Sequence, residues 1–171
     1  MRADIGINNF AVFEQGDEFY GMAEATLPEV SQMAEEIKGA GISGAFNGAF
    51  TGHVEAMTLT LNFRTVTPYA IKLNEPRNHQ LELRASQQYW DNVAGKHVQQ
   101  AIKHVLMVTP TKLAPGKLAP ASSAEASGEY AATYFATYIN GEKKMEIDIL
   151  NFIYFVNGTD YLAEVRKALG K

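Results

Sequence analysis

The sequence has 171 residues, of which 46% are hydrophobic and 20% charged, and this is enough apolar material for one domain with its own core. Fifteen Lys and Arg against nineteen Asp and Glu give a net charge of −4, which argues against a protein that clamps nucleic acid by neutralising its phosphates. The absence of cysteine excludes disulfides, thiolate metal sites and cysteine nucleophiles, and it suits assembly in a cytoplasm. No run of about 18 apolar residues occurs, so we expect no membrane segment.

The N-terminal region begins with a predicted β-ribbon. Phe10–Phe13 and Glu18–Leu27 are joined by Gln15-Gly16-Asp17, a short connection typical of a hairpin. In the segment that follows, Pro28–Lys38, apolar residues recur at helical spacing behind a proline. This spacing locally favours a helix.

Alternation of apolar and polar residues predicts two strands in the middle of the chain, over Val54–Arg64 and Asn78–Tyr89, and a long β-rich run predicts a third over Val98–Thr109. The polar face of the first strand carries Thr58, Thr60, Asn62 and Arg64. The polar face of the second carries Glu82, Arg84, Ser86 and Gln88. Such strands separate a core on one face from water on the other.

The C-terminal part has two further β-prone segments. Tyr130–Ile139 is partly apolar on both faces, and Met145–Val156 is the most β-prone stretch of the chain. Between the middle strands and these segments, residues 110–128 are rich in Pro, Ala and Ser and predict an exposed loop inside one domain, 1–171.

Two short helices are expected. Thr67 followed by Pro68 is a helix start, and Glu75-Pro76 ends the helix, which gives Pro68–Asn74. Near the C-terminus, Thr159 or Asp160 caps a helix whose apolar stripe is Leu162, Val165 and Leu169, with Gly170 at its end.

Catalytic and cofactor motifs find little support. Gly39, Gly41 and Gly44 match G-x-G-x-x-G, but no apolar strand precedes them, so a mobile loop is the better interpretation. Glu146 and Asp148 share a strand parity and are a weak candidate for acid–base work. Tyr130, Tyr134 and Tyr138 share a parity and are more consistent with packing than with nucleotide stacking. The four histidines, His53, His79, His97 and His104, have no metal-ligand spacing.

Several segments, in this order and spacing, resemble the major tail tube protein family of contractile-tailed phages. They are Asn9–Gly16, Tyr20–Pro28, Gly39–Gly44, Glu146–Asp160 and Arg166–Gly170. They bracket nearly the whole chain, whereas the middle resembles the family only in its strand pattern. Residues 110–128 depart from the more charged loop of the family.

The resemblance implies a mainly β, tail-tube-type β-sandwich or barrel subunit with a short flanking helix and a C-terminal helix, forming a continuous barrel in a hexameric ring. Stacked rings form a tube inside the tail sheath, built on the baseplate around a tape-measure protein, and double-stranded DNA passes through it during genome delivery. The implied location is the virion tail, assembled in the host cytoplasm. The resemblance implies no enzymatic activity and no cofactor.

The resemblance also favours an extended arm over the locally predicted helix, so that ribbon and arm together cover about residues 9–53. It puts the arm and its glycines at contacts between subunits and rings, and the residues expected there are Pro28, Ile37, Gly39, Gly41, Ile42, Gly44, Phe46 and Phe50. The residues expected to line the lumen are the two polar rows, Thr58, Thr60, Asn62, Arg64, Glu82, Arg84, Ser86 and Gln88.

Three alternatives remain open. A phage-derived bacteriocin or secretion-type contractile particle needs the same inner tube. An independent small β-barrel that binds a ligand would be a monomer with an apolar interior. An enzyme would use Glu146 and Asp148.

Overall fold

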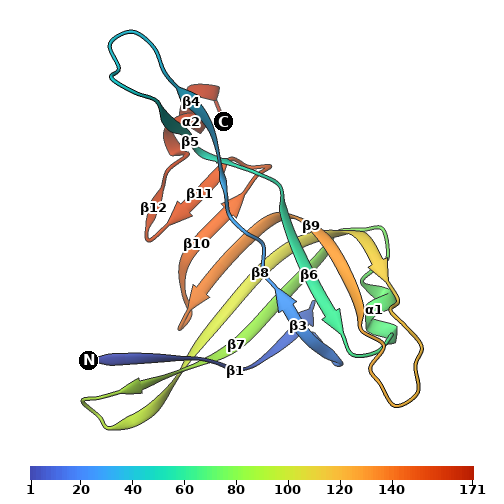
Figure 1. Ribbon diagram of the computed structural model, residues 1–171. Helices are drawn as coiled ribbons and strands as arrows, with labels where there is room; N and C mark the ends of the chain where they lie inside the picture. The colour runs from blue at the N-terminus through green and yellow to red at the C-terminus, as the bar shows by residue number, and fades with distance from the viewer.

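The computed structural model describes all 171 residues and is mainly β, with twelve strands and two short helices (Figure 1). The strands are β1 (Arg2–Glu14), β2 (Asp17–Phe19), β3 (Met22–Thr26), β4 (Gln32–Ile37), β5 (Phe46–Val54), β6 (Met57–Phe63), β7 (His79–Asp91), β8 (Lys96–Ala114), β9 (Ala126–Ile139), β10 (Glu142–Asp148), β11 (Ile153–Val156) and β12 (Thr159–Asp160). The helices are α1 (Pro68–Lys72) and α2 (Ala163–Leu169).

Ten strands form one antiparallel sheet. Its main path is β12-β11-β10-β9-β8-β7-β1-β2, while β6 pairs with the N-terminal half of β9 and β3 pairs with β6. The sheet curls, so β3 and β6 cross over β7 and β8 (Figure 1). The remaining strands, β4 and β5, pair only with each other and project from one end of the molecule.

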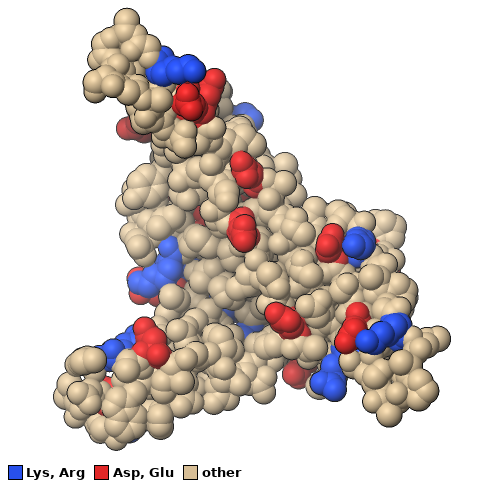
Figure 2. Space-filling model, in the orientation of Figure 1, with Lys and Arg blue, Asp and Glu red and all other residues tan.

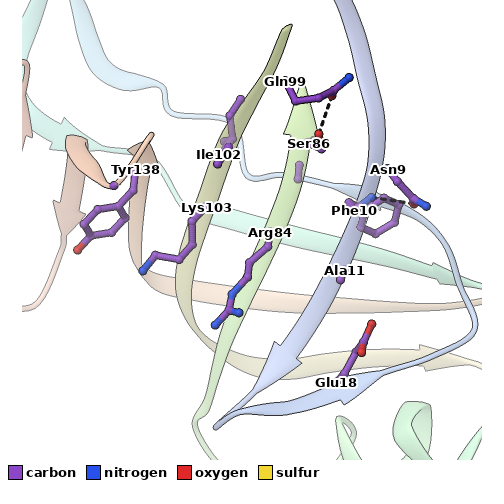
Figure 3. Close-up of a pocket in the computed structure, with 13 residues that line it drawn as sticks. Asn9, Phe10, Ala11, Glu18, Arg84, Ser86, Gln99, Ile102, Lys103 and Tyr138 are labelled. Carbon is purple, nitrogen blue, oxygen red and sulfur yellow. Dashed lines mark hydrogen bonds between the residues drawn. The ribbon is translucent and has the colours of Figure 1, made fainter. Parts of the chain in front are cut away.

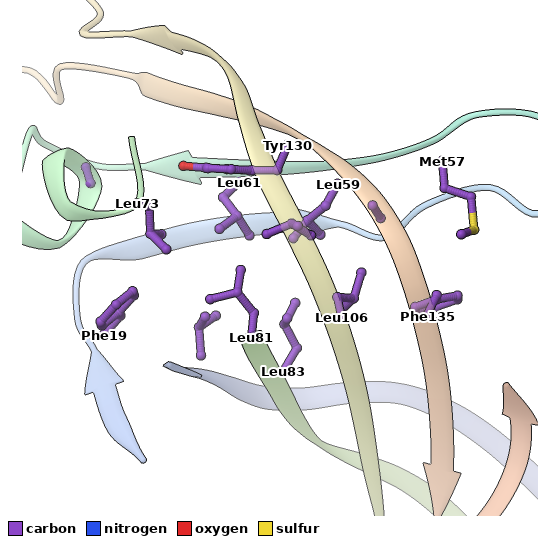
Figure 4. Close-up of a cluster of buried hydrophobic side chains, with 14 of the residues drawn as sticks. Phe19, Met57, Leu59, Leu61, Leu73, Leu81, Leu83, Leu106, Tyr130 and Phe135 are labelled. Atoms are coloured by element: carbon purple, nitrogen blue, oxygen red, sulfur yellow. The ribbon is translucent and has the colours of Figure 1, made fainter. Parts of the chain in front are cut away.

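The core lies between β6 on one side and β7 and β8 on the other. Leu59 and Leu61 of β6 point toward Leu81 and Leu83 of β7 (Figure 4). Every second residue of β6 is buried, as the alternation predicts. Because a fully buried Leu contributes roughly 1.5–3 kcal/mol, these facing leucines account for much of the stability of the curled sheet.

Both predicted helices are present, and one begins later than expected. The Thr67 hydroxyl accepts from Ala70 N at 3.3 Å, with proline at the first helical position of α1. At α2, Asp160 does not cap the helix but belongs to β12, and its carboxylate accepts from Leu162 N at 3.1 Å. Gly170 ends α2 in the left-handed conformation, at φ 72°.

Some predicted boundaries were wrong, for identifiable reasons. The strand predicted over Met145–Val156 is broken between β10 and β11, because Asp148 accepts hydrogen bonds from the backbone and side-chain nitrogens of Asn151 and turns the chain. The predicted loop is shorter than 110–128, because β8 continues through Pro110 with a bulge at this point and β9 begins at Ala126. The helix that local spacing favoured over Pro28–Lys38 is absent, and Gln32–Ile37 is a strand.

A bulge in β9 also separates the tyrosines that share a parity. Met107 pairs with Tyr134, whereas Val108 pairs with Ala132, so one extra residue of β9 lies between them. As a result Tyr130 is buried in the core, while Tyr134 lies on the opposite face of the sheet and donates to Glu146. A continuous row of three tyrosines therefore does not exist.

Candidate assembly surfaces

The β4–β5 hairpin, residues 32–54 and called the arm below, exposes apolar side chains. Ile37 and Ile42 are each 42% exposed, and Phe46 and Phe50 are 53% and 54% exposed. A two-stranded hairpin of this kind is marginally stable in water by itself. The arm therefore has the properties of a contact element.

Seven of the eight residues predicted for subunit contacts lie on the arm and are exposed. They are Ile37, Gly39, Gly41, Ile42, Gly44, Phe46 and Phe50. The eighth, Pro28, is buried within the chain itself. It precedes the arm and is not available to a partner.

The base of the arm is held against the start of α2. Gly52 has φ +73°, and a Cβ built on it would lie 2.6 Å from the side chain of Leu162. The amide of Gly52 donates to the side chain of Gln32 at 3.0 Å. Only glycine therefore allows both the backbone conformation and the close approach to Leu162.

Next to this base, Leu162 at the start of the apolar stripe is buried, but the rest of the stripe, on helix α2 itself, is uncovered. None of the residues of α2 is buried, and Val165 and Leu169 are 40% and 56% exposed. Leu150, in the turn between β10 and β11, is 70% exposed. An uncovered apolar stripe on a surface helix is typical of a contact with another molecule.

The two polar rows expected on a single face lie on opposite walls of the curled sheet. Thr58, Thr60 and Asn62 of β6 point away from the core, as do Glu82, Arg84, Ser86 and Gln88 of β7. Because β6 and β7 face each other across the core (Figure 4), the two rows point in opposite directions. Arg64 follows β6 and is exposed.

The polar face of β7 and the neighbouring strands form one continuous surface. This surface contains a shallow groove of about 730 Å³ (Figure 3). In this groove Arg84 and the cross-strand Lys103 lie side by side. The Arg84 guanidinium lies 2.7 Å from the Glu82 carboxylate. It also stacks over the Phe13 ring, 4.3 Å from the ring centre. The Lys103 ammonium lies 4.7 Å from the ring centre of Tyr138. Both cations therefore have partners within the subunit.

The two carboxylates considered for acid–base chemistry are also engaged. Glu146 accepts from the Tyr134 hydroxyl at 2.6 Å and lies 3.4 Å from Lys143. Burial, followed by the bond to Glu146, raises the pKa of Tyr134. Asp148 instead accepts from Asn151. The two carboxylates therefore serve separate structural contacts.

From Ser86 and Gln99, which line the groove, uncharged side chains continue the same face in a hydrogen-bonded ladder. Asn8 and Gln99 both donate to Gln88, at 3.2 Å and 3.0 Å. Ser86 donates to Gln99 at 2.7 Å, and Gln88 lies 3.0 Å from His97. These groups bond to one another across β1, β7 and β8, so the surface is polar and nearly neutral.

Charges elsewhere on the surface are also mixed. Figure 2 shows acidic and basic side chains interspersed over the visible face. Interspersed charge of both signs produces only a weak long-range field. No helix of the structure is both long and apolar enough to cross a membrane.

Strand β1 has an open edge that the sequence analysis missed. It pairs with β7 over nearly its whole length, but β2 covers only Val12–Glu14 on its other side. Ile5 and Ile7 in the open part are 56% and 58% exposed. The alternation of Ile5 and Ile7 with Gly6 and Asn8 is the signal that could have extended the predicted strand.

An open strand edge, a projecting arm and exposed apolar side chains on a helix are features typical of a β subunit that contacts other copies. The comparison with protein families identifies it further. The family model for phage tail tube protein FII matches residues 5–170, and the chain belongs to this family. It is a structural component of a phage-type tail tube.

Two solved structures of an extracellular contractile injection system, PVC, have a similar fold. One is the sheath/tube terminator in the extended state, with a TM-score of 0.53 at 15% identity, covering 77% of this chain and 94% of that chain. The other is the sheath–tube complex in the extended state, with a TM-score of 0.51 at 16% identity, covering 76% and 88%. No curated protein sequence matches the chain.

Proposed function

We propose that this chain forms the inner tube of a contractile particle as stacked homohexameric rings that guide double-stranded DNA. The proposal rests on the family membership and on the two ends of the curled sheet. One end is the incompletely covered β1, the other is the short β12, and the two edges differ from each other. Joining unlike edges of successive copies is a head-to-tail contact, and such a contact closes into a ring when the rotation fits. Closure would remove the exposed edges, which otherwise invite uncontrolled pairing.

The open edge of β1 is the proposed seam between subunits. On the side away from β7, the backbone donors and acceptors of Arg2–Ala11 have no strand beside them. At the other end of the sheet, the two-residue β12 covers only the end of β11. The Tyr154 amide and carbonyl of β11 are bonded to the Asp160 side chain and the Tyr161 amide. At this end, the outer side of the short β12 is therefore the edge left for a neighbouring copy.

The proposed lumen wall is the face that carries the groove and the ladder. It runs without interruption across β1, β7, β8, β9 and β10, whereas the opposite wall has only β3, β6 and part of β9. Paired charges and amides would contact a polyanion without releasing many counterions, so the DNA would not be held. On this assignment the β6 row lies on the outside of the tube.

The arm and α2 are the proposed contacts between subunits and between rings. Their uncovered apolar side chains lie at one end of the molecule, where the next ring would add (Figure 1). Further proposed partners are the tail sheath, a tape-measure protein and the baseplate, with assembly in the host cytoplasm and no enzymatic activity. A phage-derived bacteriocin or injection particle would use the same tube.

The seam is tested by placing charge on the open edge of β1. Because Ile5 and Ile7 are more than half exposed, replacing both with lysine should leave the subunit folded, while the charges on the edge strand oppose its pairing with another strand. Light scattering should then report monomers, and circular dichroism should be unchanged. Val93→Lys, at the tip of the β7–β8 hairpin and 88% exposed, is the matched control and should assemble normally. Normal tubes from the double variant would contradict the seam.

A further inference from the structure

A buried acid–base pair connects the end of β1 to the start of β7. Glu14, the last residue of β1, is 2% exposed, and His79, the first residue of β7, is fully buried. Their Oε1 and Nδ1 atoms are 2.6 Å apart. The other ring nitrogen of His79 lies 2.9 Å from the backbone oxygen of Glu75.

Both ring nitrogens of His79 face acceptors. A backbone carbonyl can only accept, so Nε2 must carry a proton. Oε1 of Glu14 also binds the Arg77 guanidinium at 2.9 Å, and a cation on this oxygen favours an ionised carboxylate, which can only accept. Nδ1 must therefore carry a proton as well, and a ring with two protons is an imidazolium.

The surroundings supply no other compensation for the carboxylate. Oε2 of Glu14 is buried without a hydrogen-bond partner, so its negative charge depends on His79 and Arg77. On the neighbouring strand β8, His79 is paired with the apolar Val108. The charged groups around the ring are therefore Glu14 of β1 and, in the loop before β7, Arg77 and Glu75.

We propose that the folded subunit holds His79 as a structural imidazolium at pH 7, paired with ionised Glu14 and bonded to the Glu75 carbonyl. The cation fixes the end of β1 against the α1–β7 loop. It thereby positions the strand that carries the open sheet edge, whether or not that edge is the seam of a ring.

Nitrogen NMR of the histidine rings in the full chain tests the proposal. At pH 7 the wild-type His79 ring should show two protonated nitrogens. His104 is the internal reference, because burial lowers the pKa of this histidine and keeps its ring neutral. The variant Glu14→Gln tests whether the Glu14 carboxylate causes the second protonation. A glutamine amide can donate to Nδ1, so His79 should then carry a single proton, on Nε2.

Two results would overturn the proposal: a His79 ring with a single protonated nitrogen in the wild type at pH 7, or a doubly protonated ring that persists in Glu14→Gln. If the variant does not fold, the wild-type spectrum decides alone. For protein that polymerises, the same measurement is made on the solid tubes.

Discussion

Arg166 holds the C-terminal segment together at the scale of a single residue. Its guanidinium binds Asp160 at 2.6 Å and donates to the backbone oxygen of Phe152, also at 2.6 Å. Partial burial pushes the pKa of Asp160 upward, but hydrogen bonds from Arg166 and from two backbone amides outweigh it, and the pKa lies below its usual range. Asp160 therefore stabilises the fold above about pH 4 and loses this effect below it.

Arg166→Ala should lower the free energy of unfolding by about 1 kcal/mol, since the contacts are partly exposed. For a chain of this size the melting temperature should fall by about 2–4 °C. Thermal unfolding followed by circular dichroism at pH 7 measures it. Lys167→Ala removes a neighbouring cation for which the structure gives no ion pair and is the control. An unchanged melting temperature in Arg166→Ala would show that the ion pair contributes nothing.

At the scale of elements, the tip of the arm contains two glycines at positive φ, Gly39 and Gly41. Gly41 has φ +87° and open space around it, whereas Gly44, three residues on, also has open space but no positive φ. The two positions therefore differ in backbone conformation rather than in crowding. A valine at Gly41 would be strained by about 1 kcal/mol or more, because β-branched residues avoid positive φ.

Gly41→Val should accordingly leave the circular dichroism of the subunit largely intact and block tube growth, because the arm tip changes shape. Gly44→Val is the matched control and should grow tubes. Electron microscopy of both variants makes the comparison. Tubes of normal length from Gly41→Val would refute the role of the arm tip.

The elements also show where sequence patterns suffice. Alternation predicted β6 and the start of β7, because one face of each strand is buried. It failed over Met145–Val156, where the short-range hydrogen bonds of Asp148 outweigh β propensity. It also could not show that the β6 and β7 rows lie on opposite walls, because alternation describes one strand at a time, whereas curvature and strand order are properties of the whole sheet.

The arm illustrates the opposite case. Local spacing over Pro28–Lys38 favoured a helix, and only the family resemblance indicated an extended segment, which the strand Gln32–Ile37 agrees with. Pairing with β5 decides the conformation, and this partner lies beyond the local window. Alternation could have extended the predicted strand to Ile5 and Ile7. Which edge of β1 is open depends on its pairing with β7, which is far away in the sequence.

At the scale of the whole molecule, the two walls can be distinguished in assembled tubes. The chain has no cysteine, so one introduced cysteine reports on one position only. Thr58→Cys on the β6 wall should react with a bulky maleimide polymer in tubes, and Ser86→Cys on the groove face should be protected. Both should react in unassembled subunits. Protection of Thr58→Cys with free reaction of Ser86→Cys would reverse the assignment of the lumen.

The central claim is that copies of this chain close into hexameric rings and stack into a hollow tube. Electron microscopy of the purified protein at high concentration tests it most directly, because symmetry, stacking and lumen are seen together. We expect sixfold rings or tubes with an open channel. A uniform monomer by light scattering, with no rings or tubes in the images, would contradict it and favour an independent β-barrel.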